Sequence, residues 1–360
     1  MIETLLFILV LAVLVLSHEF GHFYIAKKNN IAVEEFGFGF PPRVWSKRVG
    51  ETLYSINALP LGGFVRVEGE DGPVISPRSF GAQTVWVRMA VVVAGVVMNM
   101  LLAWVLLTVV AALGQPAMVD ANHPVGTLED VRVLITNIAP NSPAATAGIQ
   151  NFDVITSVTI DGRAETIETS DEFQSLVEAS KGKEMSVTLR RSGTPVSVSL
   201  TPRVTPPDGE GPIGINLGEV GVTRSSLLES PIVGFTRAFG LAGDILGALW
   251  RLATSLFGEK PISDQFTGPV GIAVLIADST KLGISFLFEL VAVLSINLAV
   301  INVLPIPALD GGRLFFLGIE AVRRRPIAPN IGRIAHSVSF IILLLLLIGI
   351  TLRDVMFLFQ

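Results

Sequence analysis

The sequence predicts a polytopic α-helical membrane protein with about four transmembrane helices, a re-entrant β-hairpin and an inserted extracytoplasmic α/β domain. Half of the 360 residues are hydrophobic and only 16% are charged, a composition too apolar for an ordinary soluble domain. A long polar segment separates two pairs of apolar segments. The net charge of -5 argues against a nucleic-acid partner. The absence of cysteine excludes disulfides, thiol nucleophiles and Cys-based zinc sites.

Four apolar segments approach the length that crosses a bilayer, and they are the predicted spans: 4–26, 86–113, 284–305 and 336–352. The first follows the residues "MIE", which include an acidic residue and no basic one. A secretory signal peptide has a basic n-region and a small-residue cleavage site, so we expect a retained span here.

Basic residues predict how these spans are oriented, because Lys and Arg concentrate in cytoplasmic loops. Residues 114–230 hold eight basic and fifteen acidic residues, which is consistent with a translocated domain. The loops on either side of this segment are basic instead, with Lys27, Lys28, Arg43, Lys47, Arg48, Arg66, Arg78 and Arg88 in one, and Arg313, Arg323, Arg324, Arg325 and Arg333 in the other. We therefore expect both basic loops in the cytoplasm and both termini outside.

The translocated domain, predicted at 120–220, has the pattern of a small α/β unit. Its first half reads as a strand, a turn, a short Ala-rich helix and a second strand that ends at Asp161-Gly162. Ser170 is expected to cap a helix, and Ser192-Gly193 to turn a hairpin. This run resembles a PDZ domain of the bacterial type, and a generic β-domain without a ligand is the alternative interpretation.

Residues 225–258 predict an amphipathic helix on the outer membrane surface. Arg237, Asp244 and Arg251 recur every seven residues, which keeps them on one helix face. A fifth span is the alternative, and the three aligned charges disfavour it. In the first basic loop, residues 54–70 alternate, turn at 61–63 and alternate again. This pattern predicts a hairpin that dips to membrane depth where it lines a cavity.

The stretch "LVLSHEFGH" places His18, Glu19 and His22 at the inner end of the first span. Histidines four residues apart on a helix project from one face and can bind one metal ion. Glu19 lies beside the first histidine, where it can accept a proton from water and pass it to a leaving amine. Two histidines buried by packing alone are the alternative, but ionisable residues in a span are costly and usually functional.

A catalytic zinc takes three protein ligands, and Asp310 is the best candidate for the third. Pro305 and Pro307 break the third span just before it, and Gly311-Gly312 permits a tight turn. This places the carboxylate at the depth of the two histidines. A helix cap or turn role is the alternative for Asp310, and Glu289 is a weaker ligand candidate because it belongs near the opposite membrane face.

The motifs "HEFGH", "GFGF" at 37–40 and "NVLPIPALDGG" from Asn302 together resemble the site-2 protease family of intramembrane zinc metalloproteases, in particular its bacterial RseP-type branch. The resemblance covers nearly the whole chain, including a PDZ-like insertion after the second span. The segment "AGVVMN" at 94–99 departs from the family pattern, which usually has Pro where Val96 stands. Asn99 is interpreted as a helix-packing residue.

The resemblance implies a role for each matching residue. His18, His22 and Asp310 would bind Zn²⁺, with Glu19 as the general base. Asn302 would position the substrate, although a hydrogen bond between helices is the alternative. The residues of the re-entrant hairpin that would pair with an extended substrate include Gly62, Gly63 and Phe64.

The expected function is therefore intramembrane cleavage of single-span membrane proteins, such as anti-sigma factors or remnant signal peptides, after a prior site-1 cleavage. The expected location is the bacterial cytoplasmic (inner) membrane, in contact with lipid, with the active site toward the cytoplasm. The predicted parts are 1–113 with the first two spans, 120–220, 225–258 and 284–360 with the last two spans. A catalytically inactive PDZ scaffold and a metal transporter are the alternatives.

Overall fold

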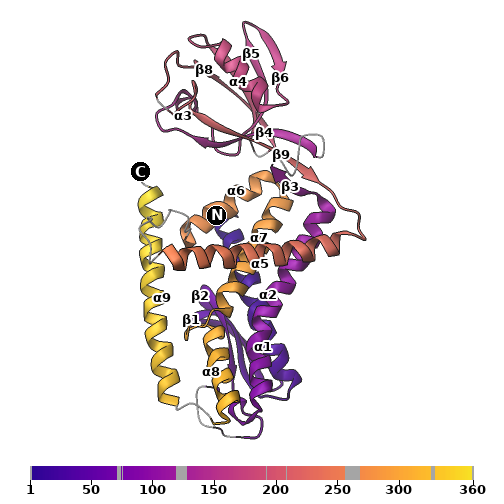
Figure 1. Ribbon diagram of the computed structural model, residues 1–360, viewed down its shortest axis with the longest axis vertical. Helices are drawn as coiled ribbons and strands as arrows, with labels where there is room; N and C mark the ends of the chain where they lie inside the picture. The colour runs from indigo at the N-terminus through magenta and orange to yellow at the C-terminus, as the bar shows by residue number, and fades with distance from the viewer. Residues whose placement is uncertain are drawn as a thin grey trace. The chain divides into compact units, whose positions relative to one another are not determined.

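The computed structural model describes residues 2–70, 74, 76–118, 128–191, 193–207, 209–255, 268–325 and 329–358. They form two compact units (Figure 1). The helical unit comprises Met1–Thr108, Pro231–Ala277 and Glu289–Gln360. The sheet unit comprises Val109–Ser230 and Asp278–Phe288.

The helices outside the large sheet are mostly long and apolar. They are α1 (Ile2–Lys28), α2 (Val85–Leu113), α5 (Ser230–Ser255), α6 (Pro269–Leu282), α7 (Ile284–Val303), α8 (Asp310–Arg323) and α9 (Pro329–Leu358), with a 3₁₀ turn η1 at Phe80–Ala82. Within the described residues, five segments are long and apolar enough to cross a membrane: Thr4–Lys28, Val85–Leu113, Ser230–Leu252, Ile284–Val303 and Gly332–Arg353. Four of them correspond to the predicted spans, and α5 also meets this criterion of length and composition.

Helix α5 runs across α2 and α7 (Figure 1), and small and aliphatic side chains pack where the three meet. Ala238 of α5 is fully buried there against residues of α2 and α7 such as Leu107 and Ala292. Of the three charges that were expected to share one face, Asp244 and Arg251 are exposed. Arg237 is half-buried and forms an ion pair with Glu289 of α7. Glu289 is not among the described residues whose ligand atoms gather with those of the histidines.

A second element of the helical unit is a sheet of β1 (Val33–Val49) and β2 (Thr52–Val67), which pair antiparallel. The prediction that the two arms of 54–70 pair with each other is wrong, because both arms pair with β1 instead. Phe36 of β1 lies opposite both Tyr54 and Val65 of β2, so the first half of β1 lies between the two halves of β2. The sequence reading missed β1 because glycines and prolines interrupt its alternation.

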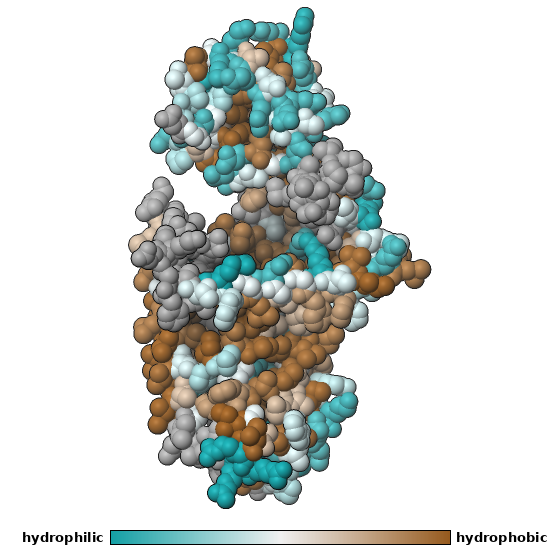
Figure 2. All heavy atoms as spheres, in the orientation of Figure 1, coloured by the Kyte–Doolittle hydropathy of each residue, from teal (hydrophilic) through white to brown (hydrophobic). Residues whose placement is uncertain are grey.

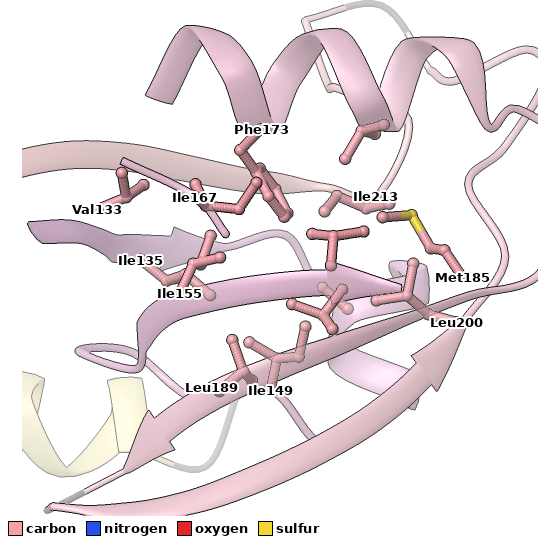
Figure 3. Packing of buried hydrophobic residues seen from close by; sticks show 14 residues of the cluster. Val133, Ile135, Ile149, Ile155, Ile167, Phe173, Met185, Leu189, Leu200 and Ile213 are labelled. Atoms are coloured by element: carbon pink, nitrogen blue, oxygen red, sulfur yellow. The ribbon is translucent and has the colours of Figure 1, made fainter. Parts of the chain in front are cut away.

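The sheet unit contains a seven-stranded sheet in the order β3-β9-β4-β5-β7-β8, with β6 paired to β5. Its elements are β3 (Gln115–Met118), β4 (Glu129–Ile138), α3 (Pro143–Thr146), β5 (Val154–Ile160), β6 (Arg163–Thr166), α4 (Ser170–Ala179), β7 (Met185–Arg191), β8 (Thr194–Leu200) and β9 (Ile215–Thr223). Phe173 of α4 and aliphatic strand residues form the core of this unit (Figure 3).

The local expectations for this unit are largely confirmed. Strand β4, the short α3 and β5 follow in the predicted order, and β7 and β8 form the predicted hairpin. The expected cap at Ser170 is wrong by one residue. Thr169 is the N-cap and forms a capping box with Glu172, while Ser170 donates to the Glu219 carboxylate of β9. Ser192 lies outside the described residues.

On the face drawn in Figure 2, a band of apolar (brown) side chains covers the middle of the helical unit. Helix α9 contributes many of these, among them Ile342 and Leu345, which are 60% and 63% exposed. In a soluble protein, a large exposed apolar surface marks a site of contact with a membrane or with another protein. The helical unit therefore has the surface expected of a protein embedded in lipid.

Candidate metal centre and active site

The two histidines of α1 face each other across one helical turn. His18 is 8% exposed, and its Nε2 lies 3.1 Å from Nε2 of His22. The helix continues without a break from Ile2 to Lys28, so the spacing of four residues places both rings on one face. Glu19 follows His18 and lines the same cavity.

Asp310 is the first residue of α8 and brings a carboxylate to the histidines. Helix α7 ends at Val303, and the Pro-containing turn that follows leads directly into α8. The chain packs so closely here that a Cβ on Gly311 would lie 2.1 Å from the Val303 carbonyl oxygen. A side chain would not fit at this position, so glycine permits the turn that aims Asp310 at α1.

The three side chains have the spacing of a metal centre. Oδ2 of Asp310 lies 3.0 Å from Nε2 of His18 and 3.3 Å from Nε2 of His22. Ligand atoms about 2.0–2.1 Å from a tetrahedral zinc ion stand about 3.3 Å apart, which is close to these separations. Oδ2 of Asp310 is buried and has no hydrogen-bond partner in the described part of the chain. A cation among the three atoms would satisfy it, so the residues present fit zinc.

Helix α2 supports the histidines from behind. Nδ1 of His22 lies 2.8 Å from the Val91 carbonyl oxygen, and Nδ1 of His18 lies 3.2 Å from Nδ2 of Asn99. Between these two contacts, a Cβ on Gly95 would lie 2.5 Å from Nε2 of His22. The sequence reading gave Asn99 only a packing role, because contacts between two helices have no signature in residue spacing.

A cavity of about 740 Å³ opens in front of the histidines. Glu19 and Asp310 line it from the helices, and Gly63 and Phe64 line it from β2. The strand passes so close to Glu19 that a Cβ on Gly63 would lie 3.0 Å from Cγ of Glu19. The backbone of β2 is thus brought directly beside the candidate base.

The other two predicted substrate residues occupy different places. Gly62 packs against the ring of Phe40, from which its Cβ would be separated by 2.8 Å. Asn302 is 9% exposed near the end of α7, and it is not among the described residues that line the cavity.

Two ion pairs near α8 were not predicted. Both guanidinium Nη atoms of Arg88, on α2, contact the Glu320 carboxylate of α8, at 3.2 Å and 2.5 Å. Arg313 of α8 pairs with Glu70, and both line the cavity. These pairs fix α8, and with it Asp310, against α2 and the end of β2. The partners are 232 and 243 residues apart in sequence, which no local pattern reveals.

Comparison with known proteins agrees with this geometry. The family model of peptidase family M50 matches residues 6–346. The chain belongs to peptidase family M50. It is 30% identical to "Zinc metalloprotease RasP" of Geobacillus kaustophilus, with 99% of each chain covered. It is 29% identical to "Regulator of sigma-W protease RasP" of Bacillus subtilis, with 98% of each chain covered.

Membership of family M50 makes this chain a peptidase, and the apolar helices make it a multi-pass membrane protein. The resemblance drawn from the histidine and Asp310 motifs is confirmed. In this M50 peptidase, both motifs meet at one cavity although His22 and Asp310 are 288 positions apart in the sequence.

Proposed function

We propose that this chain is an intramembrane zinc metalloendopeptidase that cleaves transmembrane segments of single-span membrane proteins. One observation carries the proposal: three ligand atoms converge beside Glu19, in a cavity that a β-strand also lines. Relatives whose names describe them as zinc metalloproteases support the choice of metal.

Each residue of the site has a distinct task in this reaction. His18, His22 and Asp310 hold the zinc ion, which supplies Lewis acidity to the scissile carbonyl and makes water a stronger nucleophile at neutral pH. Glu19 accepts a proton as the water oxygen adds to the carbonyl carbon. It then donates this proton to the amide nitrogen as the C–N bond breaks, so that a carboxylic acid and an amine leave the site.

The substrate is proposed to bind as an extended strand along residues 63–67 of β2. This half of β2 pairs with β1 at one edge, and no strand in the described part of the chain pairs with its other edge. A transmembrane helix hides its carbonyls in internal hydrogen bonds, so it must unwind before hydrolysis. Strand addition would hold the unwound segment beside Glu19. Asn302 is proposed to position the substrate backbone or the developing oxyanion.

The parts of the chain are proposed to be arranged across the bacterial cytoplasmic membrane as the charge bias indicates. The site faces the cytoplasm, and residues 120–220 form a PDZ-like domain on the other side. Helix α5 lies along the outer surface with apolar side chains in lipid, since Phe239 and Trp250 are 55% and 72% exposed on it.

The PDZ-like domain is proposed to exclude substrates that still carry a bulky ectodomain, so that a prior site-1 cleavage is needed. Anti-sigma factors and remnant signal peptides are substrates of the right form, and the printed name of the Bacillus subtilis relative connects it to a sigma factor. Deletion of residues 120–220 should permit cleavage of an untrimmed substrate. Continued rejection of that substrate by the deletion variant would refute the exclusion role.

The alternative classes fit the site less well. An inactive scaffold predicts the loss of one of the reacting groups, yet Glu19 and the three ligand candidates are all intact and assembled. A transporter predicts charged residues along several spans. Helix α2 instead carries one charged residue, Arg88, in its first turn.

The proposal is tested with purified protein in detergent and a tagged single-span substrate. Wild type, Glu19→Gln and Asp310→Ala are compared for cleavage and for bound zinc. We expect cleavage by wild type alone, with zinc retained by Glu19→Gln and weakened in Asp310→Ala. Equal cleavage by all three proteins would refute the proposed mechanism.

A further inference from the structure

Three positions of α2 form a stripe behind the metal site. Val91, Gly95 and Asn99 are four residues apart, so they share one face of the helix. Val91 contacts one histidine through its carbonyl, Asn99 contacts the other through its side chain, and Gly95 leaves room for both rings. This face of α2 therefore determines how the two imidazoles are held.

The contact at Val91 defines the tautomer of His22. A backbone carbonyl can only accept a hydrogen bond, so Nδ1 of His22 must carry the proton at 2.8 Å from the Val91 oxygen. A neutral imidazole has one N–H, so Nε2 is left with the lone pair that faces Asp310. Partners of this kind on the far nitrogen orient metal-binding histidines and fix their tautomer.

The contact at Asn99 has the opposite polarity. Its Nδ2 lies 3.2 Å from Nδ1 of His18, while its Oδ1 is buried and has no hydrogen-bond partner. Nδ2 can only donate, so this orientation requires a lone pair on Nδ1 and, in the neutral ring, a proton on Nε2. A histidine in that tautomer cannot bind a metal through Nε2. Rotation of the Asn99 amide by 180° exchanges its Nδ2 and Oδ1 atoms. The contact then favours a proton on Nδ1 of His18.

We propose that Asn99 is a positioning residue for the metal ligand His18, whose Nδ1 proton it accepts through Oδ1 when zinc is bound. The amide then has one orientation for each tautomer of His18, and metal binding selects the orientation with Oδ1 toward the ring. The inference rests on the proposed function, because it requires that Nε2 of His18 binds zinc. Asn99 is fully buried, so water does not replace the lost acceptor readily.

The backbone of Asn99 is anchored independently of its side chain. Its carbonyl oxygen accepts a hydrogen bond of 2.8 Å from Oγ of Ser295, on α7. Substitution of the side chain therefore leaves this link between α2 and α7 in place. An effect of such a substitution on zinc can be separated from an effect on helix packing.

The test measures zinc affinity of the full-length protein in detergent by competition with a chromophoric chelator. Asn99→Ala should weaken zinc binding about 10–100-fold, the usual effect of removing such a partner. Asn99→Asp keeps an acceptor and no donor, so it should restore affinity to within about threefold of wild type. Asn297→Ala is the matched control, because Nδ2 of Asn297 bonds to the Val293 carbonyl within α7.

His18→Ala separates this inference from the proposed function. If His18→Ala binds zinc as wild type does, the proposed ligand set is wrong, and the role of Asn99 is wrong with it. If His18→Ala loses zinc, unchanged affinity in Asn99→Ala would overturn the positioning role alone. An Asn99→Asp protein as weak as Asn99→Ala, or an equal loss in Asn297→Ala, would overturn it as well.

A measurement on the wild type does not depend on how any variant folds. Solid-state ¹⁵N NMR of the zinc-loaded, histidine-labelled protein distinguishes protonated from unprotonated ring nitrogens. We expect each zinc-bound imidazole to carry its proton on Nδ1. An unprotonated Nδ1, or zinc bound through Nδ1 of His18, would contradict the assigned acceptor.

Discussion

The helical unit and the sheet unit both bury polar side chains, but these side chains are satisfied in different ways. The core of the sheet unit consists of apolar residues around Phe173 (Figure 3). The helical unit also buries apolar residues where α2, α5 and α7 meet, but it buries His18, Asn99 and Ser295 within its helices as well. Buried polar groups are costly in an apolar environment unless they are paired. In the sheet unit the buried Asp153 is paired with Arg191, whereas Oδ2 of Asp310 in the helical unit has no hydrogen-bond partner, which indicates a bound ligand there.

The first prediction sharpens this contrast and has the largest effect. Glu19→Gln should lower the cleavage rate about 10²–10⁴-fold, because an amide cannot accept the proton from water. Zinc content and thermal unfolding should not change. The matched substitution is Glu165→Gln, at an exposed position of β6, which should leave the rate within about twofold of wild type. If the cleavage rate in detergent falls equally in both variants, Glu19 has no special role in the reaction.

The second prediction concerns stability in the sheet unit. Phe173 is 2% exposed, and Phe173→Ala should lower the free energy of unfolding of this unit by about 3–5 kcal/mol. Hydrogen exchange of the α4 amides measures this change, and zinc content should be unaffected. Val204→Ala is the control, because Val204 is 67% exposed. Zinc loss in Phe173→Ala would show that the metal site depends on the core of the sheet unit.

The third prediction concerns the ion pair between α5 and α7. Arg237→Met leaves the Glu289 carboxylate without its partner and should lower the free energy of unfolding by about 2–3 kcal/mol. The effect is below that of a fully buried pair because the two side chains are 23% and 22% exposed. Replacing Glu289 by Leu as well should recover most of the loss, as measured by denaturant titration in mixed micelles. The exposed Arg251→Met is the control, and an equal loss in it would exclude the pair as the cause.

The smallest predicted effect concerns Glu51, in the turn between β1 and β2. Hydrogen bonds from Arg78 and Lys27 lower the pKa of Glu51 from 4.5 to about 2. Because the pKa is lower in the folded state, these contacts stabilise the fold fully above the unfolded pKa near 4.5, and the stabilisation is lost as the pH falls from there toward 2. The midpoint temperature of thermal unfolding of the wild type should therefore fall as the pH is lowered over this range.

Glu51→Gln removes this ionisation. The unfolding midpoint of this variant should therefore fall less steeply between the same pH values. The difference is small because the Glu51 side chain is 40% exposed and solvent screens the pair. Identical pH slopes for wild type and Glu51→Gln would show that other carboxylates govern the decline.

The parts of the fold that could be predicted from sequence are those with a local period. The four spans follow from long apolar runs, and the face shared by His18 and His22 follows from their spacing of four. Asp310 could be placed because the prolines before it break the third span and the glycines after it permit a tight turn. In the sheet unit, alternation and turn residues were enough to find β4, β5 and the hairpin of β7 and β8.

The parts that could not be predicted depend on contacts between distant segments. The first half of β1 lies between the halves of β2, a pairing that neither strand's alternation specifies. The partners of Asn99 and Arg237 lie on other helices, so the sequence reading gave Asn99 a packing role and left Arg237 on a solvated face. The shift of the α4 cap from Ser170 to Thr169 is a different case, because both side chains can cap a helix.

X-ray absorption of the zinc-loaded wild type measures whether His18, His22 and Asp310 converge on one zinc ion. We expect one zinc per chain with two imidazole ligands and oxygen ligands at about 2.0–2.2 Å, and loss of one imidazole in His22→Ala. A zinc spectrum that is unchanged by His22→Ala and Asp310→Ala would show that these residues do not bind the metal.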